Sequence, residues 1–195
     1  MKYVTSVFIM LLGCSTAQPP QKESPPNMTP PAIGSATNWS TVEAVQENCA
    51  GALREATALR DALQEAPTGE RSVQNTLLPY NELLTHIENA LGWSSLMFQV
   101  HPDEAIRTAA GACKQDLMKF HTDVQLNRGI YDAIQAVELE DTDGSTKRFT
   151  ERALREFRRS GVDKDEATRE RVSAIQARIV ELSQTFQTNV REDVR

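Results

Sequence analysis

The three histidines of this 195-residue chain are the first candidates for chemistry, because imidazole can act as a metal ligand or a general base. His86, His101 and His121 stand apart, and none belongs to an HExxH or Glu-x-x-His pattern that would bring two ligands together. We interpret His121 as half-exposed and His101 as a contact at a helix start. The sequence also lacks GxSxG, a glycine-rich phosphate loop and a cysteine–histidine pair with a supporting acid. We therefore expect no catalytic residue and no metal site in this chain.

Cys14 is a candidate for lipidation. It ends the segment Leu11-Leu12-Gly13-Cys14, which resembles a bacterial lipobox, and it follows Lys2 and an apolar run too short to span a bilayer. Residues 1–14 therefore read as a lipoprotein signal peptide; the alternatives are a plain signal peptide with an incidental cysteine, or an unprocessed apolar tip. Ser15 in place of an aspartate favours the outer membrane, so we expect an envelope protein anchored to the membrane through Cys14 and facing the periplasm or the exterior.

The two remaining cysteines, Cys49 and Cys113, occupy apolar positions of helical patterns. An oxidising periplasm would permit a disulfide between them. A lone cysteine at such a position is more often a small buried hydrophobic side chain. The interpretation we favour is two separate buried thiols.

A basic segment, KRFTERALREFRR at 147–159, departs from the acidic character of the chain, whose net charge is −6. That net charge argues against nucleic acid as the main partner. The segment could be a docking strip for an acidic partner, a membrane surface or a peptide carboxylate, although a solvated helix face is the favoured alternative. Its basic residues are Lys147, Arg148, Arg152, Arg155, Arg158 and Arg159.

The elements that would position these residues are helical. Residues 15–38 contain six of the nine prolines and read as a flexible tether. Ser40 with Glu43 three residues later is a capping-box pattern, which predicts a helix that begins at Ser40. From there, apolar residues recur at spacings of three and four, which predicts helices that begin or end at turn and cap signals. We expect an all-α domain over 39–195, with about five antiparallel helices in a bundle-like array. The helix ranges are 40–66, 72–97, 102–126 with a shorter continuation to 137, 145–160 and 164–190. The helix over 145–160 is predicted to end at Ser160-Gly161 as a C-cap.

Two stretches carry a family resemblance: VHPDEAIRTAAGACKQDLMKF at 100–120 and ERALREFRRSGVDKDEATRERVSAIQARIVELSQTFQTNVRED at 151–193. Together they resemble the N-terminal helical region of the thimet oligopeptidase, neurolysin and oligopeptidase A family of zinc metallopeptidases. The order and spacing agree across residues 40–195. One departure is Asp163-Lys164-Asp165, where family members usually carry an apolar residue. The matching positions include His101-Pro102-Asp103, Arg107, Phe157-Arg158-Arg159, Gly161, Arg171, Phe186, Asn189-Val190 and Glu192-Asp193.

The resemblance implies a scaffold rather than an active site. Family members hydrolyse short peptides with a zinc held by an HExxH motif and a downstream glutamate, and no position here matches those residues. We expect an inactive N-terminal portion whose last helix, ELSQTFQTNVREDVR, ends at a joint before the catalytic lobe. A separate chain could supply that lobe, and short peptides are partners only when it is present. The alternatives are a stand-alone lipoprotein that binds peptides or docks proteins, and an unrelated helical bundle that assists envelope assembly.

Overall fold

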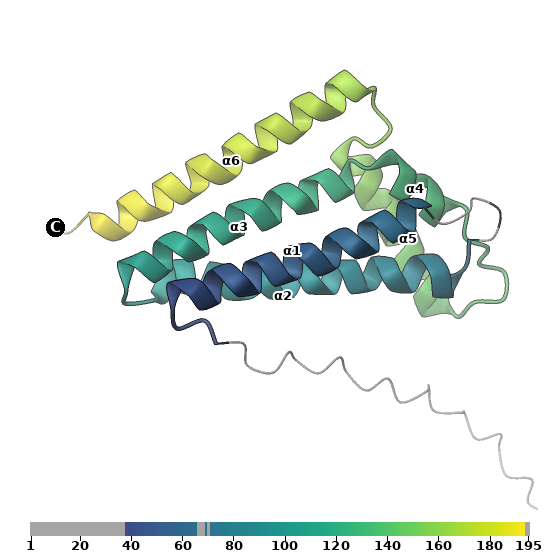
Figure 1. The fold of residues 1–195 in the computed structure, drawn as a ribbon. Helices are drawn as coiled ribbons and strands as arrows, with labels where there is room; N and C mark the ends of the chain where they lie inside the picture. Colours follow the sequence, from purple (N-terminus) through teal and green to yellow (C-terminus); the bar gives the residue numbers. More distant parts are fainter. Residues whose placement is uncertain (1–37, 66–68, 70, 194–195) are drawn as a thin grey trace, which may run out of the picture. The chain divides into compact units, whose positions relative to one another are not determined.

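A computed structural model describes residues 38–65, 69 and 71–193 (Figure 1). These residues contain helices and no strand, so the all-α prediction is confirmed. The short continuation of the third predicted helix is a helix of its own. Cys14, the signal segment and nearly all of the predicted tether lie outside the described residues. The elements are α1 (Val42–Glu65), the π-helical turn η1 (Val73–Leu77), α2 (Leu78–Val100), α3 (Glu104–Gln125), α4 (Arg128–Gln135), α5 (Gly144–Ser160) and α6 (Glu166–Glu192).

Short polar side chains fix where most helices begin, because they accept hydrogen bonds from backbone N–H groups that have no partner in the first turn. The predicted cap at Ser40 is wrong. The backbone N–H of Ala44 donates to Thr41 Oγ1 over 3.1 Å, while Ser40 donates to the side chain of Asn38 instead. Caps with side-chain acceptors also stand at Ser72, Asp103, Asn127, Asp143 and Asp165.

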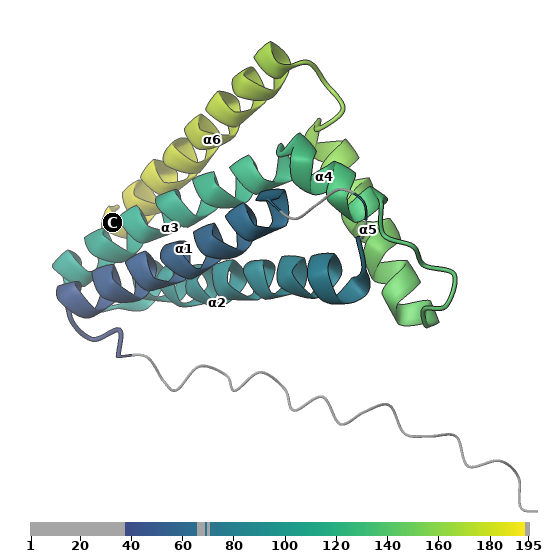
Figure 2. The same cartoon turned by 45° about the vertical axis from the view of Figure 1, so that its right-hand side comes forward.

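The core lies among α1, α2 and α3, which run alongside one another (Figures 1 and 2). Each helix contributes a stripe of apolar side chains with less than 2% of their surface exposed, which is the arrangement that stabilises an amphipathic helix. Phe157 of α5 lies at one end of this core, with ring centroids 5.7 Å from Tyr80 and 6.0 Å from Tyr131. The fully buried residues of the three helices include Val45, Leu63, Leu83, Ile87, Leu117 and Val124.

Cys49 of α1 and Cys113 of α3 form a disulfide. The interpretation as two separate thiols is therefore wrong, although both side chains are buried as expected, at 6% and 4% exposure. The two helices approach closely at this point, with 5.7 Å between the two Cα atoms, within the range that a disulfide requires. The residues are 64 positions apart, so apolar spacing along each helix could not show that they face each other.

Gly161 ends α5 as the sequence predicts, with φ at +99° in the left-handed region that other residues avoid. Its N–H donates to Arg158 O over 3.1 Å. We expect Gly161→Ala to lower the free energy of unfolding by about 1 kcal/mol. The control is Gly144→Ala in the first turn of α5, where an added Cβ meets nothing within 4 Å. Urea unfolding of both variants measures the difference, and equal stability would contradict the prediction.

Candidate functional site

Among the described residues, α6 has the most unusual packing, because its inner face is held against the rest of the protein by polar contacts. Gln184, only 6% exposed, donates from Nε2 to the carbonyl oxygen of Gly111 on α3 over 3.1 Å and accepts from Gln115. Near the end of α6, Arg191 donates to the carbonyl oxygen of Phe98 over 3.0 Å and lies over its ring. Hydrogen bonds and a cation–π contact thus hold the inner face of α6.

The apolar stripe of α6 is exposed. A helix turns by about 100° per residue, which places this stripe on the side opposite Gln184. An apolar stripe ordinarily faces the core, and a continuous exposed one marks an interaction surface. We call these residues the α6 stripe; they and their exposed fractions are Ile175 (49%), Ile179 (49%), Leu182 (51%), Phe186 (68%) and Val190 (60%).

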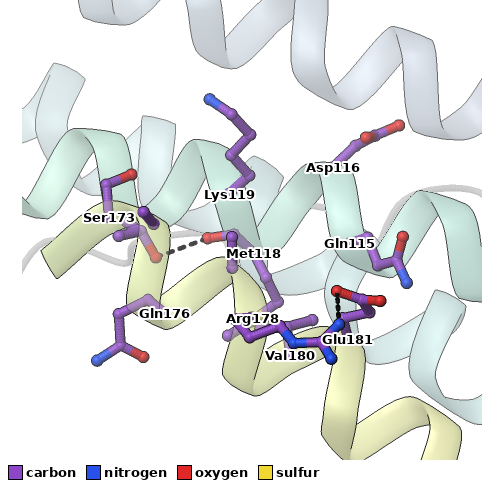
Figure 3. Close-up of a pocket in the computed structure, with 12 residues that line it drawn as sticks. Gln115, Asp116, Met118, Lys119, Ser173, Gln176, Arg178, Val180 and Glu181 are labelled. Atoms are coloured by element: carbon purple, nitrogen blue, oxygen red, sulfur yellow. Dashed lines mark hydrogen bonds and ion pairs between the residues drawn. The ribbon is translucent and has the colours of Figure 1, made fainter. Parts of the chain in front are cut away.

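A cavity of about 480 Å³ lies between α3 and α6 (Figure 3). Its charged residues are Asp116 and Lys119 of α3 and Arg178 and Glu181 of α6, and Arg178 pairs with Glu181. No histidine or cysteine is among its lining residues. The side chains offer hydrogen bonds and charge to a bound polar group, and the hydroxyl of Ser173 in the lining donates to Asp123 Oδ1 over 3.2 Å.

The histidines lie at separate places. His121 has 30% of its side chain exposed, which confirms the half-exposed interpretation, and burial lowers its pKa while Glu88 opposes that shift. His86 Nδ1 lies 2.9 Å from Glu55 Oε2. The Nδ1 atom of His101 accepts the N–H of Asp103 over 3.1 Å, which confirms a contact at a helix start. The structure therefore gives each histidine a local role in packing or capping.

The zinc site of the resembling family does not fit the part of the chain that the structure describes. Within 38–65, 69 and 71–193, no group of three or more histidine, cysteine, aspartate or glutamate side chains could hold a metal ion. Cys49 and Cys113 are joined to each other, and an oxidised pair offers no thiolate ligand. Nor does any helix among these residues have the length and apolar character needed to cross a membrane.

The predicted docking strip lies on α5. Lys147 Nζ donates to the carbonyl oxygen of Glu140 over 3.2 Å. Glu156 lies within 3.8 Å of Arg155 and 3.4 Å of Arg159. Nothing in these contacts identifies a partner, so the docking role stays a prediction. The exposed members of the strip are Arg148, Arg152, Arg155, Arg158 and Arg159.

No protein-family model matches the sequence. The chain is similar to Oligopeptidase A from Haemophilus influenzae, with 30% identity over 121 residues. The matched region is 60% of this chain and 18% of that protein, so the chain spans less than a fifth of its relative's length. This similarity supports a relationship with the oligopeptidases and fits the resemblance seen in the sequence.

Proposed function

We propose that this chain is the N-terminal, non-catalytic helical portion of a lipid-anchored zinc metallo-oligopeptidase that hydrolyses short peptides. In this proposal the catalytic lobe, with its HExxH motif and its zinc, belongs to polypeptide outside the 195 residues. The helices form one wall of the peptide channel and restrict access to short, unfolded peptides. Zinc, when bound, supplies a Lewis acid and an activated water in such an enzyme. The residues of this chain contribute the position and shape of the channel wall.

The observation that carries the proposal is the exposed α6 stripe. Its first four members follow one another at spacings of four, three and four residues, as in a heptad seam, which is narrow and suits contact with one further helix. The inner face of α6 is already held by Gln184 and Arg191. The stripe is therefore available to a helix of the catalytic lobe, while the opposite face keeps α6 in place.

The buried disulfide supports the expected location in the cell envelope. Disulfides persist in oxidising compartments and are rare in the cytosol. A bond between Cys49 and Cys113 thus agrees with export directed by the signal segment and with anchoring at Cys14. In the proposal the outer membrane holds the chain, and the helical domain faces the periplasm or the exterior.

The second candidate is a stand-alone lipoprotein that binds peptides or docks proteins. The cavity between α3 and α6 favours it, because backbone amides of a short peptide could bond to the polar side chains there. In that case the α6 stripe serves a protein partner other than a catalytic lobe.

Peptide hydrolysis tests the first candidate. We expect the chain alone to release no product from a quenched-fluorescence peptide with or without added zinc, because no described residues form a zinc site. A longer polypeptide that continues from this chain into an HExxH region should hydrolyse the same peptide. Zinc-dependent cleavage by the chain alone would refute the proposal. Saturable binding of the uncleaved peptide to the chain alone, measured by fluorescence anisotropy, would instead favour the second candidate.

A further inference from the structure

Four arginines of α5 share one face of the helix. They follow one another at spacings of four, three and four residues, and a helical turn of about 100° per residue keeps them within a narrow sector. The row extends along about 16 Å of the helix axis, at about 1.5 Å per residue. We call this set the arginine row: Arg148, Arg152, Arg155 and Arg159, all exposed.

The arginine row carries more positive charge than its neighbours neutralise. Arg155 and Arg159 share one carboxylate, Glu156. Arg148 and Arg152 make no ion pair within 4.0 Å to any residue that the structure describes. The row thus presents two unpaired guanidinium groups and two that share a single partner, on a chain whose net charge is −6.

The shape and charge of this surface suit a plane of phosphate groups better than an acidic peptide. A peptide partner is usually held by side chains buried in a pocket. The cavity of about 240 Å³ beside the row is lined by Glu88 and Glu156 as well as Arg152, so carboxylates would repel acidic side chains there. Anionic lipid headgroups instead form an extended surface that all four guanidinium groups on one helix face can reach together.

The length of the chain before α1 also permits this contact. Residues 15–38 between Cys14 and the first helix could reach about 86 Å when fully extended, since each residue spans at most about 3.6 Å. By comparison, α1 has 24 residues and a length of about 36 Å. A tether of this length lets α5, near the far end of α1 (Figure 2), reach the same bilayer that holds Cys14.

We propose that the arginine row is a second membrane contact, which lies against anionic lipid headgroups while the acylated Cys14 anchors the chain. This inference rests on the proposed anchoring at Cys14. A basic side chain near an anionic surface strengthens binding about fivefold, so loss of all four arginines should weaken it by several hundredfold. The contact should also weaken as salt rises, because it is electrostatic.

The experiment uses the full chain with Cys14→Ser, so that no acyl chain contributes. Sedimentation measures its binding to vesicles of phosphatidylcholine with and without phosphatidylglycerol. We expect tight, salt-sensitive binding only when phosphatidylglycerol is present, and its loss in R148Q/R152Q/R155Q/R159Q. The parent and the variant share residues 1–37, so any insertion of the apolar signal segment is the same in both.

A control variant removes four basic charges elsewhere: R54Q/K119Q/R171Q/R178Q. It should keep most of the vesicle binding, and circular dichroism should show both variants folded. Equal binding by the parent and the row variant would overturn the proposal, and so would binding of a polyglutamate peptide without binding of vesicles. Incorporation of labelled palmitate at Cys14 is measured separately, so a failed arginine row and a failed lipid anchor give different results.

Discussion

Reduction of the Cys49–Cys113 disulfide should lower the free energy of unfolding by about 4 kcal/mol, the chain-entropy value for a bond between residues 64 positions apart. The bond joins α1 to α3 within the core. It therefore restricts the conformations of the unfolded chain, whereas in the folded chain the two helices already lie close together. The measurement is urea unfolding of the Cys14→Ser chain with and without a reducing agent. The midpoint should fall clearly on reduction.

The control is Cys49→Ala/Cys113→Ala, which should match the reduced protein and respond to the reducing agent no further. Thiol counting in urea gives an independent reading. The Cys14→Ser protein, recovered from an oxidising compartment, should show no free thiol before reduction and two afterwards. Two free thiols at the start, or an unchanged unfolding midpoint, would mean that the cysteines are buried without being joined.

Helices α1 to α5 could be predicted from the sequence because the apolar spacing and the cap signals along them agree with the residues that the fold buries. The apolar residues of α1 and α3 that recur at threes and fours are the ones that the structure buries, including Val45, Leu63 and Leu117. Gly161 marks the end of α5 because the left-handed conformation favours glycine whatever the surroundings. The cap at Ser40 was mislocated because Thr41 beside it offers an equivalent hydroxyl, and Asn38 engages Ser40.

The site could not be predicted in the same way, because it depends on which helix faces meet. The spacing of the α6 stripe predicts a helix that buries its apolar side, yet the buried position is Gln184 on the other side. No local signal distinguishes Gln184 from the exposed glutamines of the chain, since its partners Gly111 and Gln115 lie about 70 residues earlier. The disulfide was the less favoured of the two interpretations of Cys49 and Cys113 for the same reason, because the spacing within each helix does not show that the two residues face each other. The arginines of α5 were visible in the sequence, and their partner was not.

Ile179→Lys/Phe186→Lys should leave the stability of the chain almost unchanged, within about 0.5 kcal/mol, because both side chains are about half or more exposed. The same variant should lose most of the binding of an apolar dye such as ANS, and any association that increases with protein concentration, because lysine at these positions breaks the α6 stripe. Dye fluorescence and sedimentation velocity measure these two effects.

Gln184→Ala is the matched change on the opposite face of α6, and it should behave in the reverse way. It leaves the carbonyl oxygen of Gly111 and the side chain of Gln115 without their bonds to Gln184, at a cost of about 1–3 kcal/mol in the free energy of unfolding. Its dye binding should stay as high as that of the parent or rise, since α6 is held less firmly. A large loss of stability in Ile179→Lys/Phe186→Lys would contradict this assignment of the two faces. If that loss grew with protein concentration, the stripe would be covered by a second copy, and a catalytic lobe would not be needed to explain it.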